Sequence, residues 1–119
     1  MAPELRGIVC PGDVGVKADL ASTIAVDIWA IGEILHRMLT TTPSFMDPRL
    51  PISEYVARGL EFPTSPLDAV QVSPEGVDCI RLMMAASPRA RITTTAALEH
   101  AWLKDVRGED GSESSSTQR

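Results

Sequence analysis

The sequence predicts a mainly α-helical fold with no β-sheet. Three segments repeat apolar residues three and four positions apart, which is the spacing of one face of an α-helix. No segment alternates apolar and polar residues convincingly over the length of a strand, and prolines separate the helical segments. At 119 residues, with 44% apolar and 23% charged residues, the chain has the size and composition of one globular domain.

The first predicted helix covers residues 25–39 and follows a glycine-containing loop over residues 5–22. Ser22 or Thr23 is the expected N-cap. The expected buried face has the 3, 4 and 7 spacing and consists of Ile24, Ile28, Ile31, Leu35 and Met38. Val26, Trp29 and Ala30 make the first half apolar on its other sides as well. We therefore expect this helix at the centre of the fold, surrounded by protein over its first half.

Three shorter helices are expected after it, joined by proline-rich loops. One lies within residues 51–59, between Pro51 and Gly59, and residues 60–72 are expected to form a loop. The next begins with the cap signal Ser73-Pro74-Glu75. Its expected apolar face is Val77, Ile80, Met83 and Met84. The last helix, residues 93–103, is capped by Thr93 or Thr94 and is expected to bury Ala97, Leu98, Ala101 and Trp102. The predicted domain is residues 1–103, and residues 104–119 are predicted to be a disordered polar tail.

Composition excludes several classes of protein. The net charge of −5, without a basic stripe, argues against a nucleic-acid partner. Charged residues interrupt the most apolar helix, so no membrane span is expected, and the first ten residues have no signal-peptide pattern. An intracellular location, in cytoplasm or nucleus, is the default. Cys10 and Cys79 stand outside any metal-binding pattern and are expected to be reduced thiols.

Catalytic patterns are absent from the sequence itself. It contains neither a phosphate-binding glycine motif nor histidines at metal-ligand spacing. His36 is expected on the polar, solvated side of its helix, and His100 is expected to pack near Trp102 or to interact with a helix end. By itself, Asp27 would be an acid in the first helical turn, favoured by the helix dipole.

Three local motifs, taken in order, change this interpretation. They are Ala2-Pro3-Glu4, the segment DIWAIGEIL from Asp27 to Leu35, and the segment SPRARITTTAALEHAWL from Ser87 to Leu103. Together they resemble the carboxy-terminal part of the large lobe of a eukaryotic protein kinase domain, and the ending is similar to that of serine/threonine kinases of the calmodulin-dependent type. The resemblance covers residues 1 to about 103 and implies a partial kinase C-lobe, from the APE motif through the last helix.

The resemblance also implies roles for individual residues. Glu4 would form a buried ion pair with Arg91, although both could instead be ordinary surface charges. Trp29 and Gly32 would be packing positions, and Trp102 would anchor the last helix in the core. Asp27 would accept hydrogen bonds from backbone N–H groups of the catalytic loop of a complete kinase.

The residues that perform phosphoryl transfer in kinases are missing from this chain. The family needs a metal-binding asparagine and a strand lysine, whereas this sequence has no asparagine and only Lys17 and Lys104 as lysines. We therefore expect no catalytic, cofactor-binding or metal-binding residue here, ATP and magnesium being ligands of the complete family.

Two interpretations of the chain follow. The first is a serine/threonine kinase fragment that is inactive alone, which the position of Met1 directly before the APE motif suggests. The alternative is a non-catalytic kinase-like interaction module that docks partners through residues 45–63. Expected partners are a protein substrate or docking protein, and an uncovered apolar surface predicts self-association.

Overall fold

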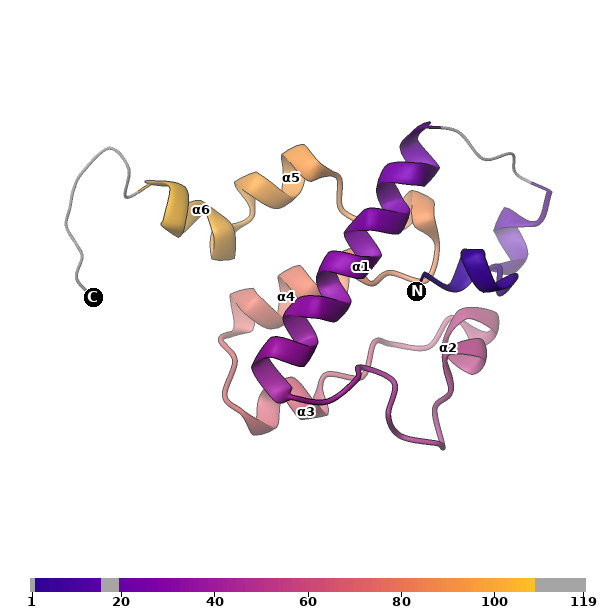
Figure 1. Cartoon of the computed structure of the whole chain (residues 1–119), viewed down its shortest axis with the longest axis horizontal. Helices are drawn as coiled ribbons and strands as arrows, with labels where there is room; N and C mark the ends of the chain where they lie inside the picture. The colour runs from indigo at the N-terminus through magenta and orange to yellow at the C-terminus, as the bar shows by residue number, and fades with distance from the viewer. Residues whose placement is uncertain (1, 16–19, 109–119) are drawn as a thin grey trace.

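A computed structural model describes residues 2–15 and 20–108 of the chain. These residues form six α-helices and three short 3₁₀ turns, and none of them belongs to a strand (Figure 1). The prediction of a helical fold without a sheet is therefore confirmed.

Helix α1, Leu20–Thr40, is the longest element and crosses the middle of the molecule (Figure 1). It packs against α3, Ser65–Ala69, against α4, Pro74–Met83, and against the turn η3, Pro88–Ala90. The helix begins earlier than predicted, so that Ser22 and Thr23 lie inside it and are not its cap. The loop before α1 contains two turns, η1 over Pro3–Arg6 and η2 over Pro11–Asp13.

The buried face of α1 differs from the predicted one. The buried residues are Ala25, Ile28, Trp29, Gly32 and His36, whereas Ile24, Ile31 and Met38 are exposed. The prediction was right for Ile28, which is buried, and wrong for Ile24, Ile31 and Met38. The reason is that α1 has apolar residues on two sides, and periodicity alone does not say which side faces the core. The side with Gly32 faces the core because α4 and the residue after it pack closely there: a Cβ at Gly32 would lie 2.7 Å from Met84 Cγ.

The middle of the chain follows the prediction apart from one additional helix. Helix α2, Ile52–Arg58, ends at Gly59, whose φ of 62° is left-handed. Helix α4 begins as predicted, with the Ser73 hydroxyl accepting a hydrogen bond from the backbone N–H of Gly76 at 3.1 Å. The predicted loop 60–72 contains α3, because Pro66 lies in the first turn, where proline is tolerated.

The predicted last helix is two helices, α5 over Thr94–Glu99 and α6 over Ala101–Gly108. The break lies at His100, whose backbone is extended and whose Nδ1 accepts a hydrogen bond from the N–H of Trp102 at 3.1 Å. As a result Ala97 is buried, but Leu98 and Ala101 are exposed, contrary to the prediction. Residues 104–108 of the predicted tail are helical, and residues 109–119 lie outside the described part of the chain.

An aromatic cluster fills the core below α1. Phe45 lies 5.0 Å from Tyr55 and 5.7 Å from Phe62 between ring centroids. The Tyr55 hydroxyl donates to the carbonyl oxygen of Met84 at 2.8 Å, and burial raises the pKa of Tyr55 to about 12. His36 is fully buried beside Phe62, so the prediction that it is solvated was wrong. Its Nδ1 donates to the carbonyl oxygen of Thr42 at 3.0 Å, whereas its Nε2 is buried without a hydrogen-bond partner among the described residues.

Candidate functional site

Arg91 lies at the junction of η1, α1 and the segment after α4. Its side chain is 0% exposed and forms a bidentate ion pair with Glu4, with N–O distances of 2.6 and 2.8 Å. The same guanidinium donates to the carbonyl oxygens of Ala85, Ala25 and Ala86. It also lies 4.9 Å above the ring of Trp29. The ion pair that the resemblance implies is therefore present, and Arg91 is not a surface charge.

A second ion pair, missed in the sequence, lies beside the first. Arg89 contacts Asp13 Oδ1 through Nη2 at 2.6 Å and through Nε at 3.0 Å, and it also donates to the carbonyl oxygen of Gly12. A hydrogen bond with Ser87 and the Arg89 guanidinium lower the pKa of Asp13. Two arginines two residues apart therefore attach the segment before α1 to the segment after α4. The only signal in the sequence is the pair of arginines in SPRAR, because Asp13 has no motif around it.

Asp27 is exposed on α1, and no hydrogen bond or ion pair joins its carboxylate to another described side chain. Because α1 begins at Leu20, Asp27 lies two turns into the helix, so its interpretation as a first-turn acid was wrong. Its carboxylate is free to accept hydrogen bonds from a group outside the described residues.

The remaining motif residues occupy packing positions. Ala2 and Pro3 are buried at η1, and the side chain of Trp29 is buried on the core side of α1. Gly32 allows α4 to approach α1 closely. Trp102 is only partly buried, and a Cβ at Gly76 would lie 3.0 Å from its ring.

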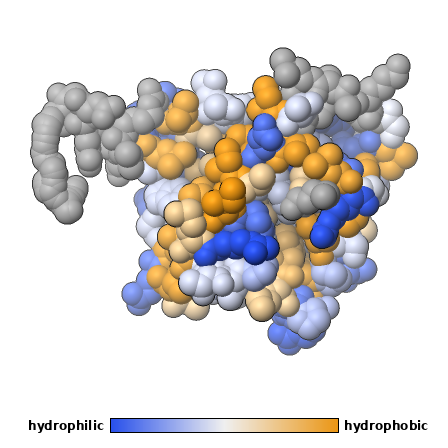
Figure 2. All heavy atoms as spheres, viewed as in Figure 1, coloured by the Kyte–Doolittle hydropathy of each residue, from blue (hydrophilic) through white to orange (hydrophobic). Residues whose placement is uncertain are grey.

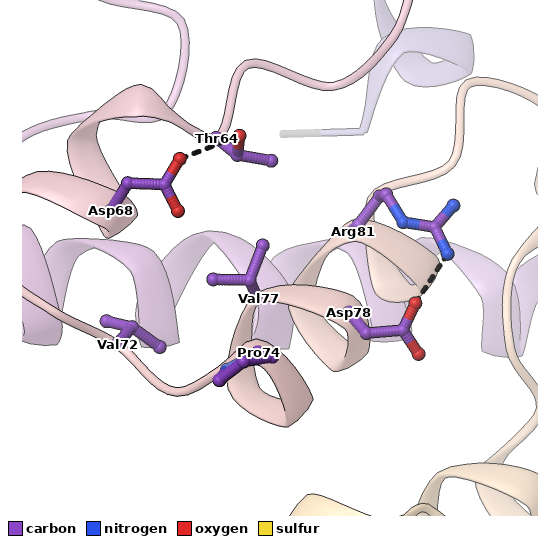
Figure 3. Close-up of a pocket in the computed structure, with 7 residues that line it drawn as sticks. All are labelled: Thr64, Asp68, Val72, Pro74, Val77, Asp78 and Arg81. Carbon is purple, nitrogen blue, oxygen red and sulfur yellow. Dashed lines mark hydrogen bonds and ion pairs between the residues drawn. The ribbon is translucent and has the colours of Figure 1, made fainter.

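A surface hollow between α3 and α4 is the one recess seen in close-up (Figure 3). Its polar groups bind one another: the Thr64 hydroxyl donates to Asp68 at 3.2 Å, and Arg81 donates to Asp78 at 2.5 Å. His100 also contacts Asp78, and together with Arg81 it lowers the pKa of that carboxyl. The hollow offers no paired nucleophile and base. Across the described residues, no three His, Cys, Asp or Glu side chains are placed to hold a metal ion.

Comparison with known proteins agrees with this arrangement. The chain is 35% identical over 82 residues to the serine/threonine-protein kinase cds1 of Schizosaccharomyces pombe, which covers 68% of the chain. It is 34% identical over 87 residues, or 71% of its length, to calcium-dependent protein kinase 29 of Arabidopsis thaliana. It is 38% identical over 82 residues, or 66% of its length, to the calcium/calmodulin-dependent protein kinase type II alpha chain of Drosophila melanogaster. No protein-family model matches the sequence.

A solved structure resembles the fold as well. The Rad53 kinase domain, in its crystal structure with SCD2 and AMPPNP, superposes with a TM-score of 0.60 and 25% identity over 83% of this chain. The chain is part of a protein kinase domain. It spans 18%, 16% and 15% of the three curated relatives and 39% of the Rad53 chain. None of the described helices of this kinase fragment is long and apolar enough to cross a membrane.

Proposed function

We propose that the chain is the distal part of a serine/threonine kinase domain, which when complete transfers the γ-phosphate of ATP to protein hydroxyl groups. The observation that carries this proposal is the buried pair of Glu4 and Arg91, which holds the APE segment against α1. The named serine/threonine kinases among the relatives support the acceptor class. An intracellular location, in cytoplasm or nucleus, is part of the same proposal.

The residues present do not fit ATP with magnesium. The sequence has no asparagine that could bind the metal. Of its two lysines, Lys17 precedes α1 in the sequence and Lys104 lies in α6, so neither is on a strand. The described residues also contain no acidic cluster that could bind a metal ion. We therefore assign no step of phosphoryl transfer to this chain, which should be inactive alone.

The contribution of the chain to the complete domain is positional. Asp27 faces outward from α1, as a carboxylate must to accept hydrogen bonds from the backbone of a catalytic loop supplied by the rest of the domain. Such hydrogen bonds would fix the position of that loop relative to the helices described here.

Nucleotide binding and phosphotransfer test the proposal. We expect the 119-residue chain to show no heat of Mg-ATP binding in calorimetry and no transfer of labelled phosphate to casein. We expect the longest natural reading frame that contains it to do both. In that longer protein, Asp27→Asn should lower kcat and leave the affinity for Mg-ATP unchanged. Phosphotransfer by the 119-residue chain alone, or none by the longer protein, would contradict the proposal.

A non-catalytic interaction module is the second candidate. It is favoured by exposed apolar side chains on α1 and by the exposed Met46 in the region 45–63. Immunoblotting of native extracts with an antibody against residues 110–119 distinguishes the two candidates by the mass of the protein detected. A band near the 12.8 kDa of this chain would favour the module, and a band of kinase size would favour the proposal above.

A further inference from the structure

His36 is a buried titratable residue that has no part in the function proposed above. Its exposed fraction is 0%, and it lies on the core side of α1 with Trp29 and Gly32. The described residues already exclude its ring from water, so further protein around them would not expose it. The chemistry of this ring therefore depends on the described residues alone.

The neighbours of the His36 ring fix which of its nitrogens carries the proton. Nδ1 lies 3.0 Å from the carbonyl oxygen of Thr42, which can only accept, so Nδ1 donates. The Thr40 hydroxyl, 3.1 Å from the same Nδ1, itself donates to the carbonyl oxygen of His36 at 2.8 Å. In the neutral ring Nε2 then carries no hydrogen, and it is the nitrogen that is buried without a partner among the described residues. The site therefore accepts the neutral imidazole in one tautomer.

A second proton on this ring would have no acceptor. Protonation places a hydrogen on Nε2, and Phe62, whose ring centroid lies 6.3 Å from that of His36, has no oxygen or nitrogen in its side chain. Burying a charged donor without an acceptor costs more free energy than burying a neutral ring with one unpaired nitrogen. The imidazolium therefore requires the site to open.

The charges of the surrounding elements do not compensate for a buried imidazolium. Glu33 lies three residues before His36 on α1, but its carboxylate accepts hydrogen bonds from Arg37 and from the hydroxyl and backbone N–H of Ser44. The Arg37 guanidinium also balances its charge. Residues 40–46 carry no charge. The charged residues beside Phe62 and on α3 and α4 lie at the surface: Glu61, Asp68, Glu75, Asp78 and Arg81.

The turn that follows α1 is the part of the site that can open. Thr41 has a left-handed φ of 64°, which is strained for a β-branched residue. Its backbone N–H donates to the carbonyl oxygen of Arg37 at 2.8 Å, and Ser44, only 3% exposed, binds Glu33. Phe45 follows directly and packs in the aromatic cluster. Opening of this turn would therefore also release the start of the segment that carries Phe45.

We propose that His36 is a pH-sensitive switch at the end of α1, whose neutral ring holds the turn 40–44 closed and whose protonation opens it. A group that binds a proton only in the open state favours opening as pH falls. A solvated imidazole takes up its proton near pH 6.5, so the closed turn keeps its full stability above that pH and loses stability below it. For one proton, the opening constant rises about 25-fold between pH 7 and pH 5.

NMR of the two histidines tests the first half of the proposal without any variant. At pH 7 the nitrogen chemical shifts should show the Nδ1–H tautomer for His36. They should show the Nε2–H tautomer for His100, whose Nδ1 accepts from the N–H of Trp102 and whose Nε2 donates to Asp78. Between pH 7 and pH 5 the His36 ring of the closed turn should stay neutral. A His36 ring that becomes protonated while the turn stays closed would overturn the proposal.

Hydrogen exchange tests the link to the turn. Exchange of the Thr41 and Ser44 amides, corrected for the intrinsic rate at each pH, should give an opening constant about 25-fold larger at pH 5 than at pH 7. His36→Asn keeps an N–H close to the position of Nδ1 but takes up no proton, so its opening constant should change less than about threefold.

The matched control is His100→Asn, which keeps an acceptor for the N–H of Trp102 and leaves His36 as the only histidine. It should show the same rise in the opening constant as the unmodified chain. An equal rise in the His36→Asn variant, or no rise in the unmodified chain, would overturn the proposal.

Discussion

Among single residues, Arg91 has the largest expected effect on stability. Its buried guanidinium is neutralised by Glu4 and donates hydrogen bonds to three backbone carbonyl oxygens, which offsets the cost of removing its charge from water. Arg91→Met should lower the free energy of unfolding by about 3 kcal/mol, because Glu4 then loses its partner. Urea denaturation measures this loss.

The control is an exposed pair of the same chemistry. Arg49 binds Asp47 at 3.0 Å with its side chain 89% exposed, so Arg49→Met should change the free energy of unfolding by less than about 1 kcal/mol. Equal losses in the two variants would show that burial adds nothing to the pair of Glu4 and Arg91.

Asp13 should make the stability of the chain depend on pH. The Ser87 hydrogen bond and Arg89 lower its pKa in the folded state below the ordinary value of 3.8. A lowered folded pKa means that the carboxylate stabilises the fold above the unfolded pKa and that this contribution is lost as pH falls through the folded value. We expect Asp13→Asn to destabilise the chain at pH 7 and to reduce the loss of stability between pH 4 and pH 2. Urea denaturation across that range is the measurement, and identical pH dependence in both proteins would count against this role.

The sequence predicted the partner of a residue where a motif was available. It failed where the role of a residue depends on which side of its helix faces the core. Glu4 and Arg91 are far apart in the chain, so their pairing was predictable only from the kinase resemblance. Asp13 has no such motif around it, so its pair with Arg89 was missed. His36 looked polar and solvated, but it lies on the same side of α1 as Trp29 and Gly32, which a count of residue types does not show.

At the scale of elements, the contact between α1 and α4 depends on Gly32. A methyl group there would meet Met84 Cγ at 2.7 Å and Met83 Cβ at 3.0 Å. Gly32→Ala should therefore cost about 1–3 kcal/mol, because the two helices must move apart. Gly12→Ala is the matched control: nothing lies within 4 Å of its Cβ, so we expect almost no change in the melting temperature. A Gly32→Ala variant as stable as the control would mean that the contact is looser than described.

The elements also show the limit of periodicity. The caps of α4 and the glycine after α2 were predictable because they depend on neighbouring residues alone. The orientation of α1 was not, because Ile24, Ile31 and Met38 repeat with the same period as the buried residues. Helix α3 and the break at His100 depend on contacts made across the fold, such as the hydrogen bond from His100 to Asp78.

For the whole molecule, the described part of the chain exposes apolar side chains along α1 (Figure 2), namely Ile24, Ile31, Ile34 and Met38. The chain should therefore enhance the fluorescence of a dye that binds apolar surface. The Ile31→Asp and Ile34→Asp variant should reduce that enhancement, and Val70→Asp should reduce it much less. Equal enhancement by all three proteins would place the dye on a surface other than the exposed side of α1.

The messenger RNA that encodes this chain tests most directly whether it is part of a complete kinase domain. Sequencing upstream of the Met1 codon should reveal an open reading frame continuous with Ala2. That frame should encode His-Arg-Asp with an asparagine five residues after the aspartate, followed by Asp-Phe-Gly. An in-frame stop codon directly upstream of Met1 in every transcript would contradict the proposal and favour a short interaction module.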